Sequence, residues 1–168
     1  MKETMSEPKV IHIEDYRQPT HLVENVALDV QIRDGETLVT ARVAYRVNPD
    51  AQTPTDVLDL NGLDVELVEI AIDGTPLEDA AWERTENGLS VRPGRNSFRL
   101  DLVTRIHPEK NTALEGLYRS GSCYCTQMEA EGFRRVTFFL DRPDILATWR
   151  VRIEADRESC PILLSNGN

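Results

Sequence analysis

The sequence predicts an all-β domain: an antiparallel β-sandwich or saddle with one long irregular loop and one short helix. Three observations carry this prediction. Apolar and polar residues alternate in several segments, and a period of two is typical of a half-buried strand. Glycine-containing turn signals separate these segments, and few segments show the 3.6-residue period of a helix. This spacing favours antiparallel strands over a regular succession of strands and helices.

The first two strands are expected on either side of the dipeptide Asp34-Gly35. Residues 26–33 alternate before the dipeptide, and residues 37–47 alternate after it. An Asp-Gly dipeptide tolerates the positive φ angles of a tight hairpin. The two segments should therefore pair as antiparallel neighbours.

A third strand is expected over residues 63–72, where it meets a second turn signal, Asp73-Gly74. The alternation changes phase between Leu67 and Val68 within this segment. Such a change of phase indicates a bulge or a bend in the strand.

Three more strands are expected in the remaining sequence. Asn87-Gly88 marks a turn before a short apolar segment, residues 89–91. Alternation resumes over residues 97–106 and again over residues 149–155. Each of these segments has the length and pattern of a strand.

The short helix is expected over residues 141–146, because Asp141 can cap its first turn and Pro143 fits there. The long loop is expected over residues 110–135. This segment has no clean alternation and mixes glycines, aromatic residues, cysteines and glutamates. Long irregular segments in compact domains are more often functional than incidental.

Length and charge limit the classes of function. A chain of 168 residues fits one domain, so residues 1–168 are expected to form a single domain. The 19 Lys and Arg residues against 29 Asp and Glu residues leave a net charge of −10. Nucleic acid is not expected as a partner, because affinity for nucleic acid comes from neutralising phosphates with positive charge.

Several features predict a cytoplasmic location without membrane association. No stretch of roughly 18 apolar residues is present to span a membrane. Residues 1–20 are rich in charge and lack the apolar region of a secretory signal. The three cysteines are an odd number, for which reduced thiols are the simplest interpretation.

Neither a metal site nor a catalytic set is expected within this chain. The three histidines lie far apart and outside any ligand spacing. The cysteines are expected to be small buried residues. A nucleophilic thiol at Cys123 or Cys125 remains an alternative on composition.

Gln127 and Glu129 form a candidate binding pair. In an extended segment, residues two apart point to the same side, with Met128 opposite. An amide oxygen and a carboxylate can then share the donors of one ammonium group. The competing interpretation is a pair of solvated side chains without a ligand.

Four segments in the second half of the chain resemble the amino-terminal domain of the bacterial aminopeptidase N family. Members of this family are gluzincin zinc metallopeptidases of the membrane alanyl aminopeptidase type. The segments are residues 111–121, 125–135, 138–144 and 163–168. The strand order between residues 16 and 60 fits the same family more loosely.

The resemblance implies one part of a zinc aminopeptidase that releases amino-terminal residues from peptides. It implies that Glu129 binds the α-amine of the substrate and that Gln127 lines the first specificity pocket. The partners implied are peptide substrates and the catalytic domain of the same chain. Zinc is implied for the full-length enzyme and not for residues 1–168, which should end before the catalytic domain and be inactive alone.

Two other functions stay open at this point. The chain can be a free-standing β-sandwich that binds a peptide or a protein through residues 110–135. It can also be a small thiol hydrolase that uses Cys123 or Cys125. The sequence that follows Asn168 separates these hypotheses, because a zinc aminopeptidase requires a His-Glu-x-x-His motif there.

Overall fold

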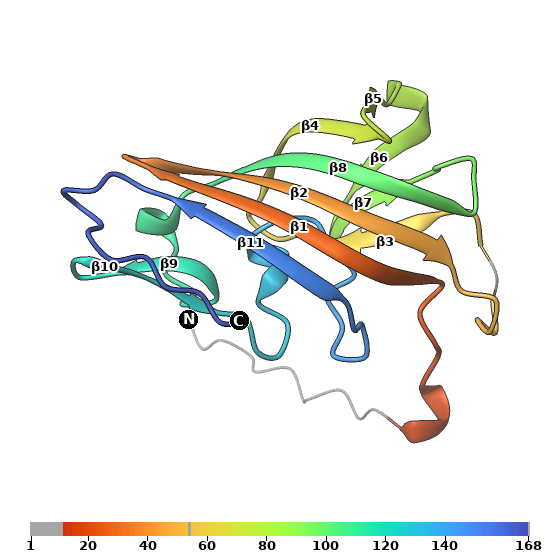
Figure 1. Cartoon of the computed structure of the whole chain (residues 1–168). Coiled ribbons are helices and arrows are strands. Elements are labelled where there is room, and N and C mark those ends of the chain that lie inside the picture. The colour runs from red at the N-terminus through yellow and green to blue at the C-terminus, as the bar shows by residue number, and fades with distance from the viewer. Residues whose placement is uncertain (1–11, 54, 168) are drawn as a thin grey trace, which may run out of the picture.

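A six-stranded sheet forms the largest part of the computed structural model, which describes residues 12–53 and 55–167 (Figure 1). The strand order is β11-β1-β2-β8-β4-β5. The strands are β1 (His21–Arg33), β2 (Glu36–Val47), β4 (Glu66–Ile72), β5 (Thr75–Pro76), β8 (Ser97–Ile106) and β11 (Thr148–Glu154). The all-β prediction is confirmed.

Two smaller sheets complete the described fold. One has three strands in the order β3-β7-β6, and the other is the β9-β10 hairpin. The strands are β3 (Leu58–Asn61), β6 (Trp82–Thr85), β7 (Gly88–Val91), β9 (Gly116–Ser120) and β10 (Cys123–Gln127). The helical segments are single 3-10 turns: η1 (Ile13–Asp15), η2 (Asp79–Ala81), η3 (Pro108–Lys110) and η4 (Phe133–Arg135). In Figure 1 the β9-β10 hairpin lies below the large sheet, under β11 and β1.

The hairpins and the bulge expected from the sequence are confirmed. β1 and β2 pair antiparallel across the Asp34-Gly35 turn, where Gly35 has a φ of 77°. β4 starts later than expected, at Glu66, and its register with β8 shifts between Leu67 and Glu69. This irregularity is the bulge that the change of phase predicted.

The large sheet is mixed rather than purely antiparallel. β11 pairs in parallel with β1, with Val26 opposite Trp149 and Val30 opposite Ile153. The alternation of a strand is the same in either direction, so the sequence of residues 149–155 contained no signal for its orientation. The direction is set by the long segment between β8 and β11, which returns the chain to the end of the sheet where β1 begins.

The prediction of a helix over residues 141–146 is wrong, because this segment contains only a turn. The carboxylate of Asp141 accepts hydrogen bonds from the backbone N and the Nε of Arg134. It is therefore not available to cap a helix that would start beside it. The carboxylate of Asp144 is likewise bound by Arg142 and by the hydroxyl of Tyr16.

Residues 110–135 are more regular than expected, because they contain the β9-β10 hairpin. Gly121, with a φ of 61°, lies in the turn between the two strands. The burial expected for the cysteines is wrong: Cys123 is exposed, and Cys125 and Cys160 are partly exposed free thiols. Only the start of the hairpin reaches the core, where Leu117 is buried, and most of its other side chains, including that of Cys123, are partly or fully exposed.

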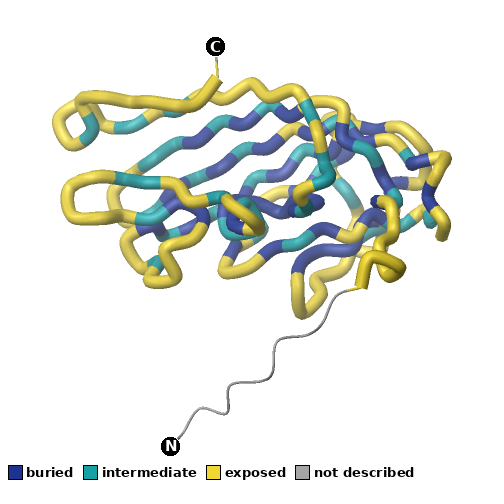
Figure 2. The backbone as a smooth tube through the Cα atoms, turned by 90° about the horizontal axis from the view of Figure 1, so that it is seen from below, coloured by how far each residue is buried: buried dark blue, intermediate teal, exposed yellow. Residues whose placement is uncertain are grey.

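The core lies between the large sheet, the three-stranded sheet and residues 136–140. Buried residues concentrate in the long central strands, whereas the hairpin and the carboxyl-terminal segment are mostly exposed (Figure 2). The largest side chains with almost no exposure include Tyr45, Phe138, Leu58, Leu89, Leu100 and Leu102. Within residues 12–53 and 55–167, no helix is long and apolar enough to cross a membrane. The expectation drawn from residues 1–20 lies in part outside the described residues.

Candidate functional site

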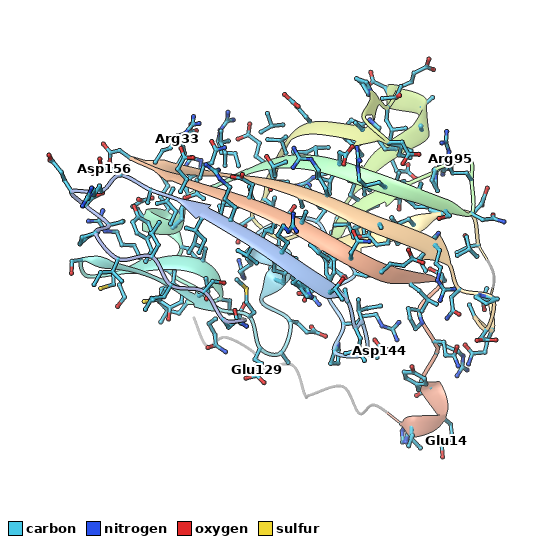
Figure 3. The ribbon with its side chains drawn as sticks, viewed as in Figure 1. Glu14, Arg33, Arg95, Glu129, Asp144 and Asp156 are labelled. Carbon is cyan, nitrogen blue, oxygen red and sulfur yellow. The ribbon has the colours of Figure 1, made fainter. Side chains whose placement is uncertain are left out.

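The loop that connects β10 to η4 carries both predicted binding residues. Gln127 is the last residue of β10, where it pairs with Gly116 of β9. Glu129 lies two residues later, in the turn that leads to η4. Figure 3 shows Glu129 at the end of this loop, pointing away from the large sheet. Both side chains are exposed.

Gln127 and Glu129 have different roles in the loop. The Nε2 of Gln127 donates a hydrogen bond to the backbone oxygen of Glu129 at 3.1 Å. The amide group therefore holds the main chain of the loop. The carboxylate of Glu129 has no hydrogen-bond or ion-pair partner among the described residues. An exposed carboxylate of this kind can accept hydrogen bonds from a ligand.

The loop closes tightly on Gly132. The backbone N of Gly132 donates to the backbone oxygen of Met128 at 2.8 Å. A Cβ at position 132 would lie 2.3 Å from the backbone oxygen of Gln127, which is far inside van der Waals contact. Glycine is required here because the two sides of the loop approach each other, and any side chain would force them apart.

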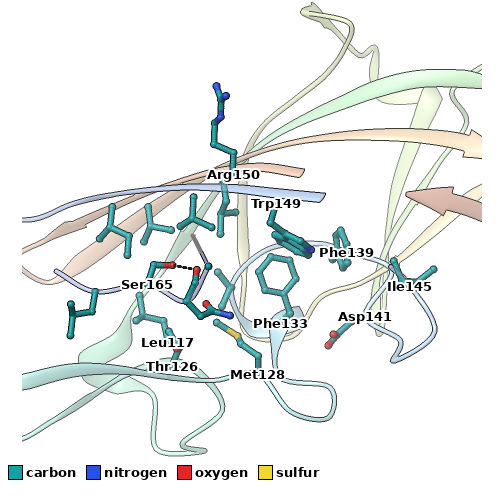
Figure 4. Close-up of a pocket in the computed structure, with 18 of the residues that line it drawn as sticks. Leu117, Thr126, Met128, Phe133, Phe139, Asp141, Ile145, Trp149, Arg150 and Ser165 are labelled. Atoms are coloured by element: carbon teal, nitrogen blue, oxygen red, sulfur yellow. Dashed lines mark hydrogen bonds between the residues drawn. The ribbon is translucent and has the colours of Figure 1, made fainter. Parts of the chain in front are cut away.

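An apolar groove with a volume of about 1320 Å³ adjoins the loop (Figure 4). The inner face of β1 and β11 forms one side of it, and the hairpin and η4 form the other. Met128 points into this groove, whereas its neighbours Gln127 and Glu129 are exposed. Phe133 packs edge-on against Trp149 with ring centroids 5.3 Å apart, and Trp149 keeps 47% of its surface exposed.

The hairpin is anchored to the 3-10 turn η3 by a polar contact. The hydroxyl of Tyr124 donates a hydrogen bond to a carboxylate oxygen of Glu109. Burial raises the pKa of Tyr124 to about 12, and the neighbouring carboxylate adds to this effect. The phenol therefore stays protonated and keeps donating near neutral pH.

The residues described do not fit a zinc ion. Within residues 12–53 and 55–167, no three His, Cys, Asp or Glu side chains come close enough to hold a metal. The ring of His21 is buried beside Thr20, and the ring of His107 contacts the backbone oxygen of Gly35. A protein zinc site needs three or four such ligands around one point.

Residues 14–168 match the family described as the peptidase M1 N-terminal domain. The chain belongs to this family. Aminopeptidase N of Escherichia coli K12 is 41% identical over 162 residues, which are 96% of this chain. Aminopeptidase N of Caulobacter vibrioides is also 41% identical, over 161 residues and 96% of this chain. The chain spans only 18% of the length of these two relatives.

Solved structures of M1 peptidases have the same fold. Aminopeptidase A of Legionella pneumophila, in a complex with aspartic acid, superimposes with a TM-score of 0.84 and 30% identity. The superposition covers 92% of this chain and 18% of that one. An M1 zinc metallopeptidase of Deinococcus radiodurans gives a TM-score of 0.65 at 21% identity, covering 83% of this chain and 33% of that one. The second comparison concerns the fold alone.

The sequence singled out Gln127 and Glu129 as candidates and assigned no role to the residues around them. Gly132 shapes the loop, and Arg134 and Asp141 join it to the rest of the domain. The glycine could have been recognised from its place in an irregular segment. The pair of charges could not, because Asp141 has an equally good local interpretation as a helix cap.

Proposed function

We propose that this M1 amino-terminal domain is part of a zinc aminopeptidase and that Glu129 binds the free α-amine of the peptide substrate. One observation carries the proposal. In a chain that is 41% identical to aminopeptidase N, the loop after β10 presents a carboxylate with no partner among the described residues. A primary ammonium group offers three donors to such a carboxylate. Gln127 lies beside it and lines the pocket for the first side chain of the substrate.

The chemistry of hydrolysis belongs to another part of the full-length enzyme. The described residues contain no ligand set for zinc, and we expect this domain alone not to cleave peptides. An exopeptidase must place the scissile bond one residue from a charged terminus. A carboxylate at a fixed distance from the metal measures that length, and it is more effective in a closed cleft than in water.

The catalytic domain of the same chain is the main protein partner in this proposal. Its contact surface includes the apolar groove beside the Glu129 loop. Trp149 and Val151 of β11 leave 47% and 39% of their surfaces exposed there. Adjoining apolar side chains that stay exposed in a soluble domain mark a surface that another domain covers. Packing over this groove also brings the Glu129 loop to the border between the two domains.

The proposed location is the cytoplasm, with neither nucleic acid nor membrane as a partner. The net charge of −10 opposes binding to phosphates and to anionic lipids. The three free thiols suit a reducing compartment. Peptides with a free amino terminus are the proposed substrates.

The domain arrangement is tested by the coding sequence beyond Asn168. We expect a His-Glu-x-x-His motif with a downstream glutamate, which would supply the zinc ligands and the general base. A stop codon directly after Asn168 would contradict the proposal. The chain would then be a free-standing binding module.

The role of Glu129 is tested in the full-length enzyme. Glu129→Gln keeps the shape of the side chain and removes its charge, and a charge-assisted hydrogen bond contributes roughly 1.5–3 kcal/mol. We expect kcat/KM for peptide hydrolysis to fall on the order of ten- to a hundredfold. The melting temperature should stay unchanged, because the exposed carboxylate has no partner to lose among the described residues.

Glu131→Gln is the matched control for this variant. Glu131 lies in the same loop and is also exposed, but its carboxylate pairs with Arg134 at 3.1 Å. We expect a much smaller loss of kcat/KM than in Glu129→Gln, because this exposed ion pair contributes little to holding the loop. Equal losses of kcat/KM in the two variants would show that the proposal places the substrate amine on the wrong carboxylate.

A further inference from the structure

Arg134 ties the Glu129 loop to Asp141 through three hydrogen bonds. The backbone N and the Nε of Arg134 donate to Oδ2 of Asp141 at 3.0 Å and 2.9 Å. The Nη2 of Arg134 donates to the backbone oxygen of Asp141 at 3.0 Å. Three contacts from one residue to another fix both the position and the orientation of the guanidinium.

Asp141 is itself held by the three-stranded sheet. Its backbone N donates to Oδ1 of Asn61 at 3.3 Å, and Asn61 is the last residue of β3. The main chains of Asn61 and Phe139 exchange two hydrogen bonds, of 2.8 Å and 3.0 Å. The side chain of Asp141 is only 8% exposed. The carboxylate is therefore a fixed point of the domain rather than a mobile surface group.

The same guanidinium also reaches into the loop. Its Nη2 lies 3.1 Å from Oε2 of Glu131, two residues after Glu129. Gly132 closes the loop between these residues and Met128. The main chain around Glu129 is thus held by Arg134, and Gly132 keeps the two sides of the loop together. The carboxylate of Glu129 has no partner of its own among the described residues, so its placement depends on this main chain.

We propose that Arg134 and Asp141 are positioning residues that act through Glu129: together they fix the loop so that its carboxylate stands where the substrate amine arrives. The inference rests on the proposed function of Glu129. Binding groups work only when surrounding contacts hold them to within a fraction of an ångström. An exposed side chain on a loop meets this requirement only if the loop is anchored to rigid structure.

Arg135 supplies a matched control. It is adjacent to Arg134 in η4, and it too pairs with two carboxylates, those of Asp64 and Glu115. Its side chain is 15% exposed, compared with 23% for Arg134. The partners of its side chain lie outside residues 128–132, so the Arg135 guanidinium resembles that of Arg134 in chemistry and burial but does not contact the Glu129 loop.

The experiment is a double-mutant cycle in the full-length enzyme, with kcat/KM for a peptide with a free amino terminus as the readout. We expect Arg134→Gln to lower kcat/KM about tenfold in the presence of Glu129. In the Glu129→Gln background the same substitution should lower it by less than about twofold, because the residue it positions is already disabled. Arg135→Gln should cause the same small change in both backgrounds.

Further variants keep the test valid if Arg134→Gln reduces the yield of folded enzyme. Arg134→Lys retains the charge and loses the planar set of donors, and Asp141→Asn retains an acceptor and loses the charge. Each should show a smaller loss of kcat/KM that again disappears in the Glu129→Gln background. The melting temperature of each variant shows whether the folded state has changed.

The possible outcomes separate this inference from the proposed function. Equal losses from Arg134→Gln in the two backgrounds would overturn the positioning role and leave the role of Glu129 intact. Full activity of Glu129→Gln alone would overturn both. A loss from Arg135→Gln that also depends on Glu129 would show that general loosening of η4, rather than the Arg134 contact, is responsible.

Discussion

The centre of the large sheet and the segment from residue 110 to residue 142 are built by different means. In the sheet, Val39, Ala41 and Val43 of β2 have no exposed surface, and the main chain is paired on both sides by β1 and β8. In the segment, much of the main chain is held by single side chains. Asn111, for example, donates to the backbone oxygens of Glu115 and Leu117 at 2.7 Å and 3.0 Å.

This difference separates stability from function in the same domain. Burial in the sheet is spread over many interchangeable apolar contacts, which together hold the domain folded. The segment buries less, and its shape depends on individual polar contacts and on close approach at Gly132. We therefore expect changes in the sheet to lower stability, and we expect changes at exposed positions of the segment, such as Glu129, to lower the activity of the full-length enzyme at nearly constant stability.

The largest expected effect on stability is at Leu100 in β8. Its side chain is fully buried, and its neighbours in the sheet are Val43 and Ile72. Leu100→Ala removes buried methyl groups and leaves a cavity, which costs about 2–5 kcal/mol. Urea unfolding of the domain should show this loss in the free energy of unfolding. Leu146→Ala is the control, because Leu146 is 85% exposed; equal losses for the two leucines would contradict the comparison.

A smaller effect is expected from His21, at the start of β1. Its ring is fully buried and packs edge-on against Phe98. Burial lowers the pKa of His21 below the usual 6.5, and the charge of Asp59 opposes this shift. The folded state therefore keeps the ring neutral at a pH at which the unfolded chain takes up a proton.

The sign of the pH dependence follows from this difference in proton uptake. The stability that depends on neutral His21 is present above about pH 6.5 and is lost as the pH falls through this value toward the lowered pKa. We expect the difference in free energy of unfolding between about pH 7.5 and about pH 5.5 to shrink in His21→Gln. An unaltered pH dependence in His21→Gln would show that the protonation of His21 does not cause it.

The regular strands were predictable because the alternation of apolar and polar residues reflects which side chains are buried. The β1-β2 hairpin and the bulge at Leu67 follow from alternation and from turn residues, both of which are local signals. The parallel pairing of β11 was not predictable, because strand direction depends on the path of the whole chain. The prediction of a helix over residues 141–146 was wrong because the carboxylate of Asp141 binds Arg134 instead of capping a helix.

The candidate site was predictable only in part. The spacing of Gln127 and Glu129 made them a candidate pair, and only the resemblance gave them roles, since a glutamate two residues from a glutamine has no periodic signal of its own. Arg134 and Asp141 were missed as a pair, because a polar contact across seven residues leaves no pattern in a single sequence. Each polar contact is specific to its two partners, whereas an apolar position reveals its environment by its period.

The smallest expected effect separates the two acidic partners of Arg134. Both Asp141 and Glu131 contact its guanidinium, but the side chain of Glu131 is 60% exposed and that of Asp141 is 8% exposed. Exposed ion pairs contribute little, because solvent screens them and two side chains must be ordered. Glu131→Gln should therefore change the free energy of unfolding by less than about 0.5 kcal/mol. Asp141→Asn should lower it by about 1–3 kcal/mol, because it removes the buried counter-charge of a partly buried guanidinium and leaves only the exposed Glu131.

Urea unfolding of both variants at one pH and one salt concentration measures this difference. Added salt sharpens it, since screening weakens the exposed Glu131 contact and leaves the buried Asp141 contact largely intact. A loss in Glu131→Gln as large as that in Asp141→Asn would show that the loop is held from its exposed side. The anchor would then be Glu131, and the connection from Arg134 to Asp141 and β3 would no longer explain how Glu129 is held in place.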